Sequence, residues 1–350
     1  MAQIETIIKD VESKRKAPIF IIKSDEILSK GGFFMGKLIG CQKRKLSAVN
    51  VVTIIVMLIV MLLFIKPLSS FADGGRRIPL ETNVGDTYLG VFYHQLGWQM
   101  VVYPYYLKSN SLWDAKGEKV DIDIQAEGIL FRPIYILRAS EQTAVFINAV
   151  VPVGRVSVKN PATGKWETST GIGDIILVPF STLIKLDEAK RLGLQLDLFI
   201  HLPFGDYQKG RLANLGTNQY SVEPFICLAK GWRWGSKELF TEIMANYLYN
   251  GENRDEQFRP GDMGRVAVNL ALMADRLTVG LSARHSVSVS EDELYDHKVA
   301  NSKVKLTEIG ASVSYQISPK CNLYVRVMEG IDGENTAKAT MIMGKIWFPF

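Results

Sequence analysis

Apolar and polar residues alternate with a period of two along most of the chain after residue 97. The alternation is clearest over residues 192–202, and it recurs over 122–130, 265–272 and 308–317. Successive side chains of a β-strand point to opposite faces, so the pattern predicts strands with one apolar and one polar face. No stretch after residue 72 sustains a helical period. We therefore predict an all-β protein.

The expected strands are long enough to cross a bilayer at a tilt, which takes about 9–11 residues. An even number of strands is expected of a bacterial barrel. We count about twelve, over residues 98–107, 121–136, 142–157, 171–185, 191–204, 218–230, 236–249, 262–273, 276–288, 304–317, 321–330 and 336–350.

Short and long connections alternate between these strands. Turn-forming residues mark short links near 139–141, 187–189, 230–232, 274–276 and 318–320, with longer polar loops near 108–120, 158–170, 205–217, 251–262 and 288–303. Short periplasmic turns and longer outer loops are typical of outer-membrane barrels. We therefore predict a transmembrane antiparallel β-barrel over residues 98–350, with both of its ends on the periplasmic side.

In such a barrel the polar face of each strand lines the lumen. Acidic and basic residues are mixed on that face, which predicts neither strong cation nor strong anion selectivity. A sealed interior of paired charges is the alternative. The predicted lumen-lining residues are Asp123, Gln125, Glu127, Asp197, His201, Glu223, Glu242, Arg265, Asn269, Arg284 and Arg326, accompanied by Phe199, Phe225 and Phe240.

Two Pro-x-Gly elements end strands that run toward the outer rim. They are Pro152 with Gly154, and Pro203 with Gly205. Proline removes a ladder hydrogen bond and glycine permits a bend, so we expect the wall to be kinked there. A break in the ladder at these kinks is a hypothetical side exit for an apolar solute.

The N-terminal region has the features of an export signal. The apolar run 48–65 follows a basic cluster at 42–45, and small residues precede a predicted cleavage after Ala72. This order defines a signal peptide over residues 35–72. An uncleaved membrane anchor is the alternative. Residues 1–34 are too long and too mixed in charge for a signal n-region, so we place the translation start at Met35.

Two further segments have expected roles. Residues 73–97 precede the first strand, and they either form a short plug in the lumen or hang in the periplasm. At the other end, Phe350 closes an alternating strand, and a terminal aromatic residue is the expected signal for the barrel-assembly machinery.

Charge and cysteine content exclude several other classes of protein. The net charge of +5 comes from residues 1–72, which hold 11 Lys/Arg and 5 Asp/Glu; the remainder has 41 − 11 = 30 basic and 36 − 5 = 31 acidic residues. The mature chain therefore lacks the positive charge that nucleic-acid binding needs. Cys227 and Cys321 have no metal-binding spacing, although a bridge between them stays open. We expect no cofactor and no metal.

Several segments resemble the outer-membrane family named for the MetA pathway of phenol degradation. They include 202–206 (LPFGD), 211–224 (RLANLGTNQYSVEP) and 250–253 (NGEN), together with 171–180 and 259–262. The resemblance implies an outer-membrane barrel that lets small hydrophobic molecules through. It supplies no catalytic residue.

The leading functional hypothesis is therefore an outer-membrane channel for passive uptake of small hydrophobic or aromatic molecules. Its expected partners are outer-membrane lipid, the barrel-assembly machinery and a small-molecule solute. The first alternative is a barrel that hydrolyses lipid, although the neighbours His285 and Ser286 point to opposite faces of one strand and cannot pair. The second is a structural or adhesive barrel without transport.

The export signal gives a direct prediction. N-terminal sequencing of the heat-modifiable band from an outer-membrane fraction is expected to begin at Asp73. An inner-membrane band that retains residues 48–65 would show an anchored protein instead.

Overall fold

Twelve long antiparallel strands form a closed β-barrel in the computed structural model, which describes residues 83–93, 96–318 and 321–349. One sheet holds thirteen strands, of which the short β4 (Trp166–Ile172) continues the line of β5, leaving twelve in the wall. The wall strands are β1 (Gly97–Trp113), β2 (Lys119–Ala139), β3 (Thr143–Lys159), β5 (Ile175–Asp187), β6 (Leu192–Leu202), β7 (Ser221–Trp234), β8 (Lys237–Asn250), β10 (Met263–Ala274), β11 (Leu277–Ser288), β14 (Lys305–Ser318), β15 (Cys321–Glu334) and β16 (Thr336–Pro349).

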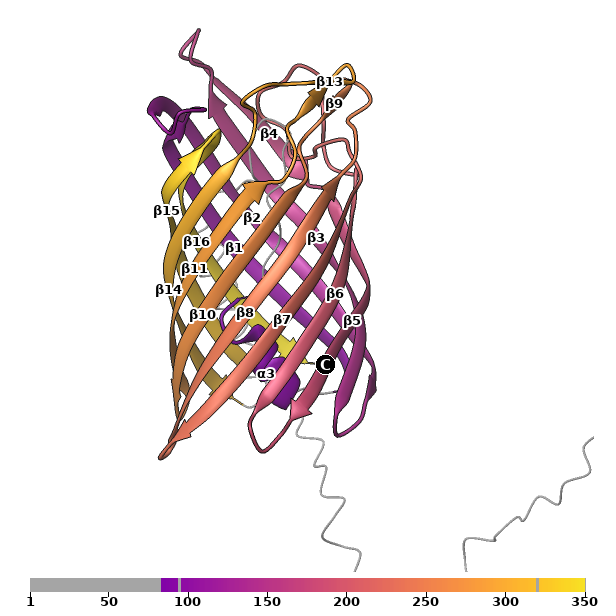
Figure 1. Cartoon of the computed structure of the whole chain (residues 1–350), viewed down its shortest axis with the longest axis vertical. Helices are drawn as coiled ribbons and strands as arrows, with labels where there is room; N and C mark the ends of the chain where they lie inside the picture. The colour runs from indigo at the N-terminus through magenta and orange to yellow at the C-terminus, as the bar shows by residue number, and fades with distance from the viewer. Residues whose placement is uncertain (1–82, 94–95, 319–320, 350) are drawn as a thin grey trace, which may run out of the picture. The chain divides into compact units, whose positions relative to one another are not determined.

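The barrel closes because the first wall strand pairs with the last. β1 runs antiparallel to β16, in a register from Gln99 opposite Pro349 to Trp113 opposite Thr336. Each remaining wall strand pairs with its neighbours in the chain, so no wall strand is left at an edge (Figure 1). Closure satisfies the backbone N–H and C=O groups that lipid cannot hydrogen-bond. The predicted fold class and strand number are confirmed.

The outward face of the strands carries a band of apolar side chains. Val266, Leu281 and Ile309 lie in this band and are 49–63 % exposed in the isolated chain. Trp98, Trp232 and Trp234 lie exposed near the ends of strands joined by short turns, and Tyr220 and Tyr249 lie near the opposite ends. An apolar band between aromatic belts is typical of a barrel in a bilayer.

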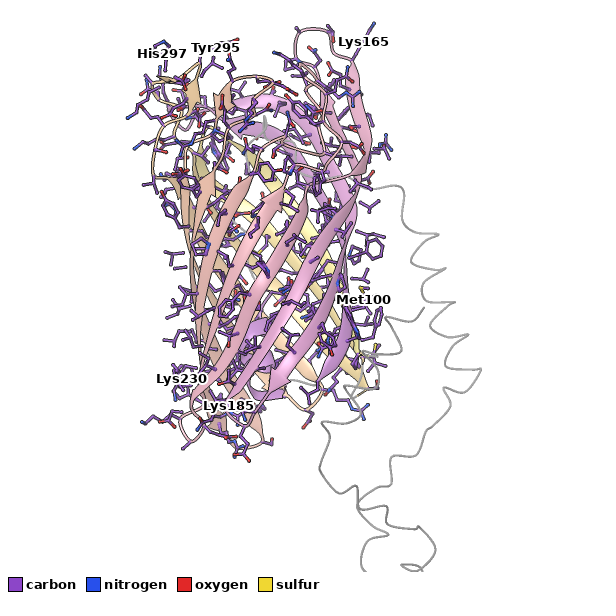
Figure 2. The ribbon with its side chains drawn as sticks, turned by 90° about the vertical axis from the view of Figure 1, so that its right-hand side faces the viewer. Met100, Lys165, Lys185, Lys230, Tyr295 and His297 are labelled. Carbon is purple, nitrogen blue, oxygen red and sulfur yellow. The ribbon has the colours of Figure 1, made fainter. Side chains whose placement is uncertain are left out.

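Charged side chains mark the two ends of the barrel. Lys185 and Lys230 lie at the end with short turns, which we call the periplasmic end, whereas Lys165 and His297 lie at the outer end (Figure 2). The outer end also carries three two-residue strands, β9 (Phe258–Arg259), β12 (Glu293–Leu294) and β13 (His297–Lys298), which pair as a small separate sheet.

The predicted lumen position of Asp123, Gln125 and Glu127 is wrong. In β2 the inward residues are Ile124 and Ala126, which are 5 % and 0 % exposed. Directly opposed residues of paired strands share a face, and Ala126 lies opposite the buried Leu107. The three polar residues therefore face outward.

The reason is the length of β2, which has 21 residues. About half of those residues suffice to cross the bilayer. The outer part of β2 extends beyond the apolar band, where the outward face meets headgroups and water rather than lipid tails. There Asp123 forms an ion pair with Lys159 at 3.1 Å.

A short helix, α3 (Asp86–Tyr93), precedes β1 and packs against β5, β6, β7 and β8 near the periplasmic end of the barrel (Figure 1). Among the described residues no helix is long and apolar enough to cross a bilayer. The predicted signal peptide, its cleavage after Ala72, the start at Met35 and the terminal Phe350 lie outside the described residues.

The band on the outward face predicts how arginine substitutions depend on depth. Leu281→Arg is expected to lower the free energy of unfolding by ~2–4 kcal/mol, because its charge enters the middle of the bilayer. Gln125→Arg, on the outward face near the outer rim, is expected to cost about 0–1 kcal/mol. Urea unfolding of the barrel in lipid vesicles measures both; equal costs would contradict the assignment of the band.

Candidate translocation path

Eight of the predicted lumen-lining residues are buried on the inward face of the wall. They are at most 7 % exposed and lie on β6, β7, β8, β10, β11 and β15. The eight are Asp197, His201, Glu223, Glu242, Arg265, Asn269, Arg284 and Arg326. Their role in lining a path for solute stays a prediction.

These side chains form a hydrogen-bonded network rather than isolated charges. Arg284 and Glu308 form an ion pair with Nε 2.7 Å from Oε2, and a terminal nitrogen of Arg284 donates a hydrogen bond to Glu308 Oε1 at 2.8 Å. His201 Nε2 lies 3.1 Å from Glu223 Oε2, and Arg265 Nε donates to Ser286 Oγ at 2.8 Å. Buried charges need such partners. Part of the lumen wall therefore consists of paired polar side chains.

Two apolar clusters also line the lumen, and the second shares β6, β7, β8 and β10 with the polar network. An outer apolar cluster joins β1, β2, β3, β15 and β16. A second cluster lies across β3, β5, β6, β7, β8 and β10, where Phe199 and Phe225 meet edge to face with their ring centres 6.1 Å apart. The outer cluster consists of Leu107, Ile124, Ala126, Val156, Val158, Ala213, Leu215, Met328 and Met341.

The inward face of β2 connects these clusters along the barrel. Ala126 belongs to the outer cluster, Leu130 packs on the second, and Ile136 packs with Val91 of α3 near the periplasmic end. One charged residue interrupts this apolar track: Arg132, whose Nε donates to Asn148 Oδ1 at 2.8 Å. The sequence correctly predicts the alternation in β2, but the apolar face of this strand lines the lumen and the polar face does not.

Helix α3 is held by a lumen carboxylate at its N-terminus. Glu242 accepts hydrogen bonds from the backbone N–H of Gly85 and of Tyr88, both at 2.9 Å, and from Asn269 Nδ2 at 2.9 Å. A carboxylate at this position satisfies unpaired N–H groups and complements the positive end of the helix dipole. Asp86 forms an additional ion pair with Lys345.

Tyr88 anchors the middle of α3. Its ring stacks on Phe240 with centres 4.5 Å apart, and its hydroxyl donates to Glu238 Oε1 at 2.6 Å and accepts from Arg191 Nε at 2.6 Å. Burial and the hydrogen bond to Glu238 raise the pKa of this hydroxyl, so it stays protonated at neutral pH. Residues 83–93 therefore occupy the lumen at the periplasmic end.

Three wall glycines make room for this segment. A Cβ atom on Gly231 would lie 2.1 Å from the Tyr88 hydroxyl oxygen, and one on Gly193 or Gly280 would lie 2.7 Å from Val91 or Val84. Any side chain at these positions would have to displace the segment. The wall is thus shaped to receive α3, a signal that the strand pattern alone did not reveal.

The outer end is narrowed by the loop over residues 203–220. Ala213 and Leu215 of this loop are 0 % and 6 % exposed and pack into the outer apolar cluster. Asp174 holds the loop by accepting bonds from Gly205 N at 3.0 Å and from Thr217 N and Oγ1 at 2.8 and 2.7 Å. The sequence predicts only a polar outer loop near 205–217, without this packing into the lumen.

The predicted wall kinks lie beside this anchor. At Pro152, β3 changes its pairing partner from β5 to β4, and the segment between β4 and β5 has one residue more than the facing part of β3. Gly173 N donates a hydrogen bond to Pro152 O at 2.9 Å across this point. Pro203 lies beyond the end of β6, and a Cβ on Gly205 would lie 2.7 Å from the Gly216 Cα. The wall is bulged at Pro152 and bridged by hydrogen bonds, and the side exit stays a prediction.

Two alternative chemistries lack the geometry they need. His285 Nδ1 lies 2.9 Å from Thr307 Oγ1 on the exposed face, whereas Ser286 is buried in the lumen, so the two neighbours do not pair. Cys227 and Cys321 are both free thiols. In the part of the chain that the structure describes, no three His, Cys, Asp or Glu side chains gather as a metal site.

Comparison with known proteins adds a family and a fold. The model of the family described as "Putative MetA-pathway of phenol degradation" matches residues 109–346. The COG4313 outer membrane channel from Pseudomonas putida F1 has a TM-score of 0.68 and 18 % identity, over 77 % of this chain and 100 % of that one. Its likeness shows the fold alone. No curated protein sequence matches the chain.

Two other solved barrels are more distant. The transport unit of the autotransporter AIDA-I from Escherichia coli has a TM-score of 0.48 and 10 % identity, over 80 % of this chain and 95 % of that one. The CymD monoaromatic hydrocarbon channel has a TM-score of 0.38 and 9 % identity, over 81 % and 97 %. Likenesses this weak carry no argument about function.

The fit between α3 and the wall gives a testable consequence. Gly231→Ala is expected to push Tyr88 out of its place, at a cost of ~1–3 kcal/mol in the free energy of unfolding. Because α3 then no longer fills the periplasmic end, single-channel conductance in planar bilayers is expected to rise. Gly264→Ala is the control, because its Cβ meets only Val289, at 3.9 Å. Equal conductance in both variants would show that α3 does not restrict the path.

Proposed function

The chain belongs to the family described as "Putative MetA-pathway of phenol degradation", and on that premise we propose that it is an outer-membrane channel for the passive uptake of small hydrophobic or aromatic molecules. The similar fold in Pseudomonas putida F1 is that of an outer membrane channel. The expected location is the outer membrane of a Gram-negative cell, reached by the general secretory route.

The observation that carries this proposal is the apolar track along the inward face of β2. Selectivity for ions is built from rings of carbonyl groups or charged side chains. Here the track offers apolar contact from the outer cluster, through Leu130, to Ile136 beside α3, interrupted by Arg132. The hydrogen-bonded polar side chains elsewhere on the lumen wall, which include Arg284 and Glu308, supply polar partners for a hydroxyl or carboxylate group.

Transport requires contacts strong enough for entry and weak enough for release. Burial of one methylene contributes about 0.8 kcal/mol, so a single aromatic ring gains a few kcal/mol along such a track. The loop residue Leu215 at the outer end and helix α3 at the periplasmic end narrow the path. We propose that movement of these two segments sets the rate of passage, because each packs into the lumen at one of its two ends.

Influx into proteoliposomes tests the proposal. Benzoate is the aromatic probe, because its charge limits leakage through lipid, and arabinose of similar mass is the polar probe. The wild-type chain is expected to pass benzoate faster than empty vesicles do. Leu130→Asn, which removes apolar contact from the track, is expected to slow benzoate by up to about tenfold, the equivalent of roughly two methylene contacts, and to leave arabinose influx unchanged.

Ile129→Asn is the matched control, because Ile129 precedes Leu130 on the same strand and points to the opposite face. It is expected to leave benzoate influx at the wild-type rate. Heat-modifiable gel mobility checks that both variants fold. Lipid turnover by the pure protein without influx would favour the hydrolase alternative. If the protein shows neither solute influx nor lipid turnover, the alternative of a structural or adhesive barrel is favoured.

A further inference from the structure

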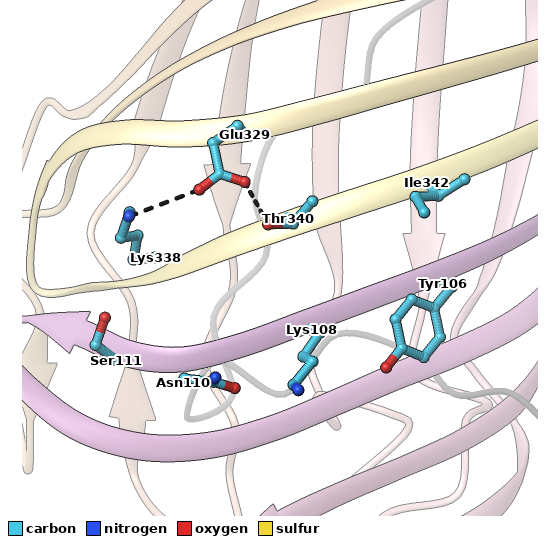
Figure 3. Close-up of a pocket in the computed structure, with 8 residues that line it drawn as sticks. All are labelled: Tyr106, Lys108, Asn110, Ser111, Glu329, Lys338, Thr340 and Ile342. Carbon is cyan, nitrogen blue, oxygen red and sulfur yellow. Dashed lines mark hydrogen bonds and ion pairs between the residues drawn. The ribbon is translucent and has the colours of Figure 1, made fainter.

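A groove of about 400 Å³ lies on the outward face of the barrel, where β1 meets β16. It is separate from the lumen, because its residues alternate with the buried Met328 and Met341 on the same strands. Figure 3 shows its lining side chains, which come from β1, β15 and β16: Tyr106, Lys108, Asn110, Ser111, Glu329, Lys338, Thr340 and Ile342.

A bulge in β1 shapes this groove. The register between β1 and β16 passes from Ser109 opposite Ala339 to Leu112 opposite Ala337, so β1 contains one residue more. An extra residue leaves the ladder locally unpaired and redirects a side chain. The Ser109 hydroxyl bridges the gap, at 2.6 Å from Ser111 O and 2.7 Å from Lys338 O.

The groove lies at the height of the outer-leaflet headgroups. Lys108 follows Trp98 of the periplasmic aromatic belt by ten residues on one strand. At ~3.3 Å per residue and a tilt near 40°, these residues rise about 25 Å, which is the height of the apolar band. Below Lys108 the outward face of β1 is Trp98, Met100, Val102, Pro104 and Tyr106; above it comes Asn110.

Two ammonium groups face this groove. Lys108 is exposed and has no ion pair within the described part of the chain. Lys338 lies 3.7 Å from Glu329 Oε1, a distance too long for a charge-assisted hydrogen bond. The other oxygen of Glu329 accepts the hydroxyl of Thr340. Lys108 and Lys338 therefore keep donors for an anionic ligand.

We propose that the groove binds the phosphate of an outer-leaflet lipid, with Lys108 and Lys338 as its cationic partners. Ile342 is 44 % exposed at the lower side of the groove and continues into the apolar band with Val327 of β15. An acyl chain attached to the phosphate packs along this surface, a contact that free phosphate cannot make. The site is independent of transport, and it needs only that the barrel lies in a membrane whose outer leaflet carries phosphate.

Native mass spectrometry of the full chain in detergent tests the site, with diphosphorylated lipid A as the probe. Lys108→Gln combined with Lys338→Gln is expected to reduce lipid retention about 30-fold, because each lysine near a lipid surface contributes about 1 kcal/mol. Lys116→Gln with Lys165→Gln removes the same charge from outer loops beyond the groove and is expected to retain lipid A as the wild type does.

Glu329→Gln provides a second measurement that does not depend on loss of binding. Removing this carboxylate frees Lys338 and relieves repulsion, so retention is expected to rise. The proposal is overturned if both double-lysine variants lose lipid A equally, or if Lys108→Gln with Lys338→Gln retains lipid A as the wild type does. It is also overturned if Glu329→Gln retains less lipid A than the wild type. Displacement of the lipid by millimolar inorganic phosphate would indicate a free-anion site instead. Heat-modifiable gel mobility identifies variants that fail to fold. If the lysine variants do not fold, lipid A retention by Glu329→Gln tests the proposal by itself.

Discussion

The pairing of β1 with β16 is the constraint on which the rest of this structure depends. Lipid offers no partner for a backbone N–H or C=O group, so an open sheet edge inside the bilayer would cost several kcal/mol per unpaired group. Closure between Gln99–Trp113 and Thr336–Pro349 removes that edge. It also encloses an interior that side chains, loops or water must fill. The outer loop and helix α3 fill it at the two ends.

The interior that results is divided between two kinds of surface. Paired charges such as Arg284 and Glu308 lie on β11 and β14, whereas the outer apolar cluster on β1, β2 and β3 holds residues such as Leu107, Ala126 and Val156. A second apolar cluster shares β6, β7, β8 and β10 with other polar side chains of the lumen. Paired charges hold the wall rigid without presenting a net field. The apolar residues offer a solute hydrophobic contacts, whose strength depends little on the orientation of the solute. This division supports the proposal that small hydrophobic or aromatic solutes pass through the barrel.

Strand positions could be predicted from sequence because a period of two survives wherever one face meets lipid. All twelve predicted strands overlap observed ones. Which face of β2 points into the lumen could not be predicted in the same way. The rule that polar residues face the lumen holds only for the part of a strand that lies within the bilayer. Beyond it water lies on the outward side, and Asp123, Gln125 and Glu127 face outward.

The contents of the lumen were even less visible in the sequence. Helix α3 has eight residues, and its position is set by contacts with distant strands, such as Glu242 with the backbone of Gly85. The glycines that receive it, Gly193, Gly231 and Gly280, have no distinctive local pattern. Their inward positions on β6, β7 and β11 are the feature that points to such packing. Likewise, nothing local in residues 203–220 shows that Ala213 and Leu215 enter the lumen.

Closure and its register can be measured directly by a disulfide between the first and last strands. Val102 lies opposite Ile346 in the observed pairing, so Val102→Cys with Ile346→Cys, in a chain with Cys227→Ser and Cys321→Ser, places two thiols within bonding distance. We predict that mild oxidation in the membrane forms this bond within one chain and increases gel mobility after heating. Cross-linking between chains, no cross-link, or an equally efficient bond between Val102→Cys and Met343→Cys would contradict the closed barrel and its register.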